Sequence, residues 1–566
     1  MTSALPTPTE AALLQQALAL HRAGDLGRAI TAYQRVLAAS PRDPDALHML
    51  GVALGQTGRP AEALPLIQAA VEVYPNSAMV HLNLGNTLKA LQRHSEALGC
   101  YRRAAQLAPE RIEIHEAMCE TAMALGAHAE VLASAGRALS LRPADAGLLL
   151  CRASALLGLD RPEDALACCD QALKARPDDW DAHTRRGISL AKLRRTAEAE
   201  QAFTRATALN PTNALLHCYL GNLYVTRRKH QQAVTSFEKA LELKPGDLDA
   251  GWNLALMKLV QGDFRQGWPL YELRFAMDAR RGAPRRFPEW RWTGSEDLRG
   301  KRILLWSERG LGDTLQFLRY APLIRDEGAE VTVEVQPCLK ALLESQFPGV
   351  HVVGGDEPTP DFDYQCPLLS VPGALGTEPD TIPAAVPYLR VDPAAVERWS
   401  GRLPPGEVLR VGIAWQGNPD AERNWASGRS WPLQALEPLS RHPGVRLISL
   451  QTGRGSEQLA SAAFADRILS FGDQLDAGPH AFLDTAAILM NVDLLITCDT
   501  SLAHLAGALG VPVWVALHTT SEWRWLLERE DSPWYPTMRL FRQRTEGDWG
   551  PVVSDISRAL DTFAAR

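Results

Sequence analysis

The chain has 566 residues, of which 46% are hydrophobic and 22% are charged, and its formal net charge is −7. This composition is typical of a globular protein with about three to five folding units, and it excludes collagen-like and wholly disordered proteins. No block of like charge is long enough to predict a segment that binds nucleic acid. Of the 15 tryptophans, only Trp180 precedes residue 252, and this asymmetry predicts two architectures joined end to end.

Cysteine usage and the N-terminal residues favour a cytoplasmic protein. The nine cysteines have no CxxC spacing and are spread over both halves, which predicts reduced, mostly buried thiols. The chain starts without the basic segment of a secretion signal. Its longest apolar run, Leu505–Leu517, is too short to cross a bilayer, so we expect no transmembrane segment.

The first half is periodic. Prolines stand 34 residues apart at Pro41, Pro75, Pro109, Pro143, Pro177, Pro211 and Pro245. Small residues such as Gly85 and Gly187 recur 24 positions before these prolines, and large ones such as Tyr101 and Phe203 recur eight positions before them. Such columns predict pairs of closely crossing helices, with the proline ending the second helix of each pair.

These columns resemble the tetratricopeptide repeat. The resemblance implies a short tail (1–9), seven repeats (10–247), and a degenerate eighth repeat with a junction (248–299). A solenoid of this kind offers a concave groove, so we expect a protein or peptide partner there. The alternative is that the solenoid only supports the second half or forms an oligomer. We expect four tryptophans to seal the junction: Trp252, Trp268, Trp290 and Trp292.

After Gly300 short apolar runs alternate with helical segments, which predicts α/β lobes with parallel sheets. The predicted strands are Arg302–Trp306, Glu330–Val335, Val350–Val353, Leu409–Trp415, Arg446–Leu450, Asp493–Thr497 and Val511–Leu517. The predicted helices are Thr314–Asp326, Pro337–Phe347, Leu433–Arg441, Ser456–Phe464, Phe482–Met490 and Leu502–Leu509. We place one lobe at 300–390, a linker at 391–407 and a second lobe at 408–566, with a ligand cleft between the lobes.

Two strand–helix turns carry the clearest candidate chemistry. The first is Gly310–Leu–Gly312–Asp313, where the glycines allow close approach of a ligand and Asp313 is expected to cap the following helix. A plain helix cap is the alternative. The second contains Asp499, Thr500 and Ser501, whose hydroxyls and backbone N–H groups predict a phosphate cradle at a helix start.

Other candidates lie around these turns. His504 is either a packed core histidine or part of the cradle, and Asp499 either fixes the loop or contacts a sugar hydroxyl. Arg429 can pair with a diphosphate, the alternative being an exposed loop arginine. The aromatic cluster around Trp523 is expected to seal an interface between lobes, with the role of Arg524 left open. The basic stretch 278–302 is interpreted as a solvated junction, with an anionic ligand as the alternative.

GLGDT, the Arg-Ser-Trp-Pro element and DTSLAHLAGALG occur in that order. Together they resemble the ADP-heptose:lipopolysaccharide heptosyltransferases, glycosyltransferase family 9. This resemblance implies a GT-B fold of two Rossmann-like lobes and an inverting transferase that uses a nucleotide sugar and no metal or other cofactor. It implies that Asp313 is the general base. The implied donor-binding residues are Gly310, Gly312, Gln416, Arg429, Glu457, Asp499, Thr500, Ser501 and His504, with Gln316, Gln451 and Arg524 as further candidates.

Two departures bear on the substrates. Arg429 stands where the family has a phosphate-binding lysine, so the donor need not be ADP-heptose. The first lobe is short, so we expect the repeats to recognise the acceptor, which favours a protein over a lipopolysaccharide or other glycan. Two alternatives stay open: a repeat scaffold with an inactive transferase module, and a metal-dependent transferase that uses Asp361 and Asp363.

Overall fold

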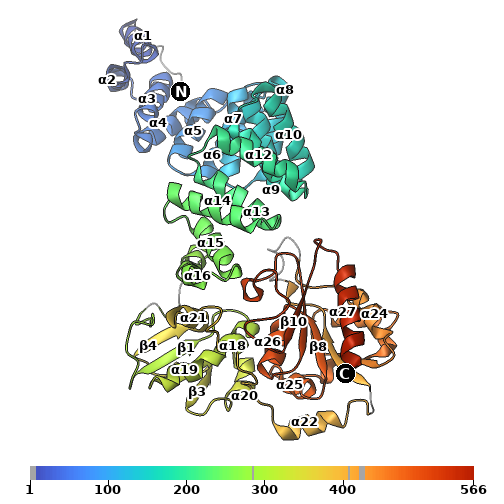
Figure 1. The fold of residues 1–566 in the computed structure, drawn as a ribbon. Coiled ribbons are helices and arrows are strands. Elements are labelled where there is room, and N and C mark those ends of the chain that lie inside the picture. The colour runs from blue at the N-terminus through green and yellow to red at the C-terminus, as the bar shows by residue number, and fades with distance from the viewer. Residues whose placement is uncertain (1–7, 283–285, 288, 406–407, 420–427, 566) are drawn as a thin grey trace. The chain divides into compact units, whose positions relative to one another are not determined.

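A computed structural model describes residues 8–282, 286, 287, 289–405, 408–419 and 428–565. The chain divides into two compact units, Met1–Leu223 and Tyr224–Arg566, and the division falls inside helix α13 (Ala214–Thr226). The first unit is entirely helical and the second contains both sheets (Figure 1). The predicted order, a repeat solenoid followed by an α/β region, is confirmed.

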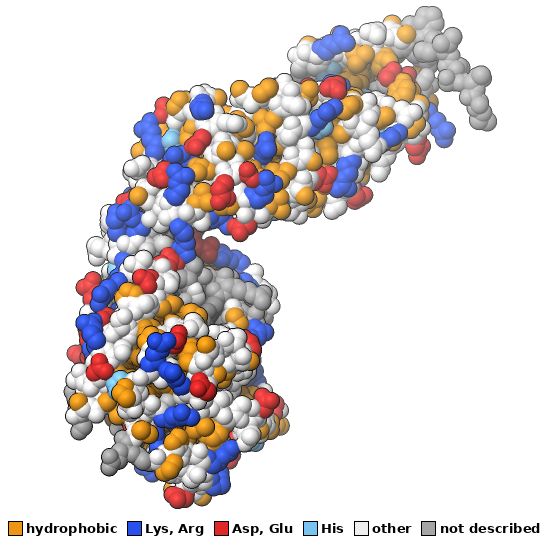
Figure 2. Space-filling view, turned by 90° about the vertical axis from the view of Figure 1, so that its right-hand side faces the viewer, with side chains coloured by type: hydrophobic (Ala, Val, Ile, Leu, Met, Phe, Trp, Pro, Cys, Tyr) orange, Lys and Arg blue, Asp and Glu red, His pale blue; other side chains and the backbone are white. Residues whose placement is uncertain are grey.

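The first unit consists of antiparallel helix pairs. Their bounds are α1 Pro8–Arg22, α2 Leu26–Ala39, α3 Pro44–Gln56, α4 Pro60–Val73, α5 Ala78–Ala90, α6 His94–Leu107, α7 Ile112–Ala124, α8 His128–Leu141, α9 Ala146–Gly158, α10 Pro162–Ala175, α11 Trp180–Lys192 and α12 Thr196–Leu209. The second helix of each pair ends two residues before its periodic proline. Basic and acidic side chains are interspersed on the face that Figure 2 shows.

The periodic small residues and the periodic large residues contact each other inside the helix pairs. A Cβ atom at Gly85 would lie 2.4 Å from Cε1 of Tyr101, and one at Gly187 would lie 2.6 Å from Cε1 of Phe203. The predicted close crossing is therefore confirmed. The fourth repeat has Cys119 and Ala135 where other repeats have a glycine and a large residue, yet it forms the same kind of pair, α7 and α8, with both residues buried.

The second unit begins with the last repeats. It contains the end of α13, from Tyr224 onward, and the helices α14 His230–Leu243, α15 Leu248–Val260, α16 Phe264–Tyr271 and α17 Arg274–Arg280. Trp268 donates a hydrogen bond from Nε1 to the carbonyl of Thr377 (2.8 Å), and its ring lies 5.3 Å from that of Trp523. Trp252 and Trp292 also pack in this core. The prediction is wrong for Trp290, whose surface is 63% exposed.

The first lobe holds a parallel four-stranded sheet in the order β3-β2-β1-β4. Its strands are β1 Arg302–Trp306, β2 Glu330–Val335, β3 Val350–Gly354 and β4 Tyr364–Pro367. Its helices are α18 Leu311–Phe317, α19 Ala321–Asp326, α20 Lys340–Leu343 and α21 Val371–Ala374, with a 3₁₀ turn at Leu318–Tyr320 between α18 and α19. The single helix predicted after β1 is thus broken into three pieces.

The second lobe holds a parallel six-stranded sheet in the order β10-β9-β8-β5-β6-β7. Its strands are β5 Leu409–Ala414, β6 Val445–Ser449, β7 Ile468–Leu469, β8 Leu494–Cys498, β9 Val513–Leu517 and β10 Met538–Arg542. Its helices are α22 Pro393–Ser400, α24 Glu437–Ser440, α25 Leu483–Leu489, α26 Ser501–Ala508 and α27 Gly550–Ala564. From β5 the chain continues to β6 and β7 on one side of the sheet, and from β8 it continues to β9 and β10 on the other side. A topological switch point therefore lies between β5 and β8.

Two predictions for this lobe are wrong, and some of its elements are not predicted. The expected linker 391–407 contains α22, which packs on α25 and is tied to it by Trp399 Nε1 donating to Asp484 Oδ1 (2.8 Å). The expected helix Ser456–Phe464 is a 3₁₀ segment, Ser456–Ser461, which follows Gly455 at φ 93°. Strands β7 and β10 and helix α27 are not predicted from the sequence.

Candidate functional site

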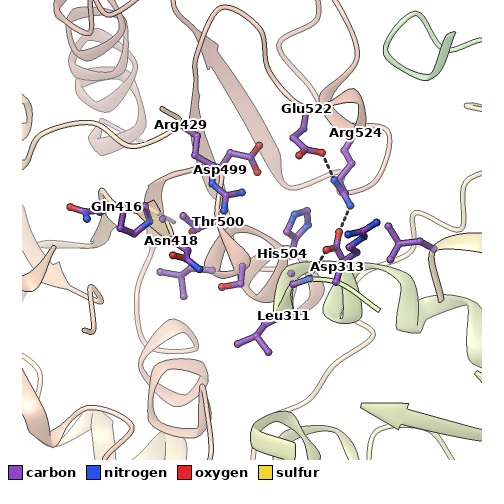
Figure 3. A pocket seen from close by; sticks show the side chains of 18 of the residues that line it. Leu311, Asp313, Gln416, Asn418, Arg429, Asp499, Thr500, His504, Glu522 and Arg524 are labelled. Carbon is purple, nitrogen blue, oxygen red and sulfur yellow. Dashed lines mark hydrogen bonds and ion pairs between the residues drawn. The ribbon is translucent and has the colours of Figure 1, made fainter. Parts of the chain in front are cut away.

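A cavity of about 970 Å³ opens between the two lobes, at the carboxyl ends of the strands (Figure 3). Its walls are the loops that follow β1, β4, β5, β6, β8 and β9, together with residues of α15, α16 and α17 and with Phe482, which precedes α25. The loops after β5 and β8 meet at the switch point of the six-stranded sheet, where open α/β sheets bind their ligands. The cavity is therefore placed where the topology predicts a ligand site.

Asp313 faces this cavity from α18. Its Oδ2 accepts a hydrogen bond from the backbone N–H of Gly310 (2.9 Å). The N-cap of α18 is Gly310, so the prediction that Asp313 caps a helix starting at Thr314 is wrong. Asp313 is the third residue of the helix, and its carboxylate reaches back to the free N–H group of the glycine.

Gly312 brings the two lobes together. A Cβ atom at this position would lie 2.9 Å from Cδ2 of His504 and 3.2 Å from Cα of Ser501. Helix α18 of the first lobe therefore packs directly on the first turns of α26 in the second lobe. Gly312 serves this close packing, and both Gly310 and Gly312 line the cavity.

Substituting Gly312 by alanine is expected to destabilise the second unit by about 1–3 kcal/mol, the usual cost of overpacking. The neighbours cannot move cheaply, because one is backbone and the other is a buried ring. Urea denaturation followed by tryptophan fluorescence measures the effect. Gly401→Ala is the matched control, since nothing lies closer than 3.9 Å to its Cβ. Equal stability of the two variants would contradict the packing argument.

The N-terminus of α26 opens into the cavity. Thr500 is its N-cap, with extended backbone angles and no capping hydrogen bond from its side chain. Thr500 and Ser501 both line the cavity, so the hydroxyls and the positive end of the helix dipole face the same space. Asp499 is buried at its edge, and no described group hydrogen bonds to its Oδ2.

His504 lines the cavity and is also packed in the core. Its Nδ1 lies 3.1 Å from the Tyr535 hydroxyl, and its ring stacks on Trp525 at 5.4 Å. Burial, followed by the nearby charges of Arg524, Arg319 and Arg429, lowers the pKa of His504 well below 6.5. The imidazole is therefore neutral at physiological pH and supplies a hydrogen-bonding group rather than a charge.

Arg524 joins the lobes electrostatically. Its guanidinium is ion-paired with Asp313 and with Glu522, and its Nε donates to Gln316 Oε1 at 2.7 Å (Figure 3). Burial disfavours this charge, but Asp313 and then Glu522 outweigh burial and raise the pKa of Arg524. Gln316 is fully buried and acts on the cavity only through Arg524.

The remaining predicted residues divide into three kinds. Arg429 lines the cavity beside Asp499, and Gln416 also lines the cavity; residues 420–427, which precede Arg429, are outside the described part of the chain. Gln451 also lines it, but its amide clamps the loops, accepting from the backbone N–H of Trp415 and Gln416 at 3.1 and 3.0 Å. Glu457 does not line the cavity; its Oε2 accepts from the N–H of Gly455 (2.6 Å).

One wall of the cavity is not assigned to the site from the sequence, apart from the alternative of an anionic ligand for the basic stretch 278–302, to which Asp278 and Arg281 belong. It comes from α15, α17 and the residues next to them, and its lining residues are Trp252, Tyr271, Arg274, Met277, Asp278 and Arg281. Arg274 is only 1% exposed and binds Glu308 through two hydrogen bonds, of 3.1 and 2.7 Å. Asp278 pairs with Arg309 at 2.8 Å. These bonds tie α17 to the loop that ends in Gly310.

The structure also locates the alternative metal-binding pair and the aromatic cluster. Asp361 and Asp363 precede β4, and both contact Arg302 at the start of β1. They therefore lie at the amino ends of these strands, away from the cavity at the carboxyl ends. The aromatic cluster is buried as expected: Trp523, Trp525 and Trp534 are at most 3% exposed.

Comparison with known proteins places the repeats in a family. Family models described as tetratricopeptide repeat match residues 20–82, 78–111, 151–214 and 216–247. Tetratricopeptide repeats are thus present in the N-terminal region. They support a role in protein interaction.

The match to one curated relative is longer than the match to any of the repeat models. Protein FlbA of Caulobacter vibrioides is 31% identical over 340 residues, which are 55% of this chain and 54% of FlbA. The chain thus spans about half the length of this relative. Among solved structures, a tetratricopeptide-repeat protein of Thermus thermophilus, TTC0263, is 26% identical, with a TM-score of 0.28 over 32% of this chain and 100% of its own. YrrB is 21% identical, with a TM-score of 0.29 over 32% of this chain and 95% of its own.

The described residues include no helix with the length and apolar character needed to span a bilayer. None of the nine cysteines, all of which lie among the described residues, forms a disulfide, and six of them are buried.

Proposed function

We propose that the chain is an inverting glycosyltransferase that takes a sugar from a nucleotide-sugar donor. The observation that carries the proposal is the cavity itself: the open N-terminus of α26 and Arg429 lie on one side, and the Asp313 carboxylate lies on the other. A diphosphate needs the first set of groups and an acceptor hydroxyl needs the second. The order of the three motifs, similar to the heptosyltransferases, supports the same assignment.

In the proposed reaction, Asp313 takes the proton of the acceptor hydroxyl as the hydroxyl oxygen bonds to the anomeric carbon. The bond from that carbon to the diphosphate breaks, and the electron pair leaves with the diphosphate. Attack opposite the leaving group inverts the anomeric centre. The dipole of α26, Arg429 and Arg524 stabilise the growing negative charge, which is the role that a metal has in other transferases. We therefore propose that no metal is required.

Each oxygen of Asp313 is already engaged in the free protein, one by Gly310 and the other by Arg524. A carboxylate oxygen has a second lone pair, so an acceptor hydroxyl can still bind. Arg524 contacts the proposed base and lines the same cavity as the proposed diphosphate-binding groups. We propose that it positions Asp313 and helps to stabilise the leaving group.

The acceptor in this proposal is a protein recruited by the repeats. Residues of α15 and α17 line the cavity, so the last helices of the repeat region take part in the site. The first lobe is small, with a sheet of four strands, and offers little further surface for an acceptor. Nine cysteines outside any disulfide fit a reducing compartment, and the proposed location is the cytoplasm.

A thermal-shift screen of the full chain against nucleotides and nucleotide sugars tests the donor assignment. Since a ligand that binds only the folded protein stabilises it by about 2.7 kcal/mol at 100 times its Kd, the correct donor should raise the Tm. The shift should be lost in Arg429→Gln and kept in the exposed control Arg398→Gln. Absence of any shift with every nucleotide would contradict the proposal. A shift without turnover would favour the scaffold with an inactive module.

A further inference from the structure

A second cavity, of about 640 Å³, lies beside the edge strand β10 and shares no lining residue with the first. Three carboxylates, Glu528, Glu530 and Asp555, face it. They are outnumbered by six arginines: Arg228, Arg529, Arg539, Arg542, Arg544 and Arg558. All these residues belong to the second unit.

Four of the six arginines have carboxylate partners. Arg529 pairs with Asp531, Arg539 pairs with Glu530, and Arg544 and Arg558 share Asp555. For Arg228 and Arg542, the described part of the chain offers no carboxylate within ion-pair distance. Among the described residues, the cavity therefore holds two cationic side chains that lack a counter-charge.

Arg542 is half-buried and donates only to neutral acceptors. Its Nη1 bonds to Ser521 Oγ (2.8 Å), its Nη2 to the Trp525 carbonyl (2.6 Å), and its Nε to the Arg529 carbonyl (3.3 Å). Burial, together with the charges of Arg228 and Arg529, lowers the pKa of Arg542 to about 10. The protein thus keeps a guanidinium in surroundings that disfavour its charge.

A neighbouring donor is also unsatisfied. Gln543 lines the same cavity and is only 2% exposed, and its Nε2 has no hydrogen-bond partner among the described residues. Its Oε1 is used, because it accepts from the N–H of Gly547 at 3.3 Å. A buried amide N–H without an acceptor is costly, so its presence points to an acceptor supplied by a ligand.

We propose that this second cavity binds a small diphosphate-bearing anion, held by Arg228, Arg542 and the amide of Gln543. A guanidinium group can donate two parallel hydrogen bonds to two oxygens of one phosphate. The cavity volume lies within the range of small-ligand sites. Ser521 and Trp525, which Arg542 holds, flank Glu522 and Arg524 of the first cavity. Occupancy of the second cavity therefore stabilises the loop that carries Arg524.

Calorimetric titration of the full chain with inorganic pyrophosphate tests this site. It is carried out in Arg429→Gln, which weakens anion binding in the first cavity. Adding Arg228→Gln is expected to weaken pyrophosphate binding about tenfold, as expected for the loss of one charged hydrogen-bonding partner. Adding Arg398→Gln instead, which removes the same charge from the exposed surface of α22, is expected to change the affinity less than twofold. Arg228 is preferred to Arg542 as the target because it does not hold the loop.

Three results would overturn the proposal. The first is unchanged affinity in the Arg228→Gln variant. The second is an equal loss in the Arg398→Gln variant, which would mean general charge screening. The third is Arg228-dependent binding of a poly-glutamate peptide more tightly than pyrophosphate, which would make the cavity a docking surface for an acidic protein segment.

Discussion

Asp313→Asn is expected to reduce sugar transfer by about 10²–10⁴-fold, the usual contribution of a general base. The amide cannot accept the acceptor's proton, yet it keeps the size of the carboxylate and an oxygen for the N–H of Gly310. The affinity for the donor should stay within a few-fold, because the phosphate cradle and Arg429 are untouched. Initial rates of transfer, with donor binding measured in parallel by calorimetry, provide the check.

The control is Asp326→Asn, an exposed carboxylate on α19 of the same lobe that contacts Arg325. It should change neither rate nor affinity. Full transfer by Asp313→Asn would remove Asp313 as the base. A parallel loss of donor affinity would instead assign Asp313 the role of positioning Arg524, with which it is ion-paired.

Removing residues 1–213 is expected to lower modification of a protein acceptor by about 10²-fold or more, since tethering typically contributes 10²–10⁴-fold to effective binding. Release of nucleotide by slow donor hydrolysis should persist. The truncated chain starts at Ala214, so that helix α13 stays whole. A longer deletion to residue 247 would remove the end of α13 and the whole of α14, which belong to the second unit.

Circular dichroism and the Tm of the truncated chain establish that the second unit remains folded. Transfer to the protein acceptor at the full-length rate would show that the repeats do not recruit it. Loss of donor hydrolysis from a folded truncated chain would show that the repeats act on the donor site itself.

The repeat half is predictable from the sequence because its signals are local and recur. The 34-residue proline period and the pairing of glycine with a large ring, as at Gly85 and Tyr101, each mark one helix crossing, and the structure repeats this crossing along the unit. Strands buried in the sheets, such as β5 and β8, are found for a similar reason, because they are continuous apolar runs. The edge strand β10, MRLFR, is interrupted by two arginines instead of being continuously apolar, and it is missed.

The site is predicted in part, for a physical reason. Residues that follow a buried strand within one motif, such as Asp313 and Thr500, are brought to the cavity as the strand order requires. Contacts between distant segments leave no local signal, and the ion pair of Arg524 with Asp313 joins residues 211 positions apart. The same is true of Arg274 and Glu308. Glu457 matches the corresponding glutamate of the heptosyltransferases only loosely, and its carboxylate accepts a hydrogen bond from the N–H of Gly455 in the same turn.

The central claim is that the cavity between the lobes transfers a sugar without a metal. The most direct measurement follows transfer from the donor identified by the thermal screen, with nucleoside diphosphate release and anomeric configuration read by NMR, with and without EDTA. We predict product of inverted configuration, formed at the same rate in EDTA and abolished by Asp313→Asn. Retained configuration, EDTA-sensitive turnover, or no turnover by a chain that binds the donor would contradict the account.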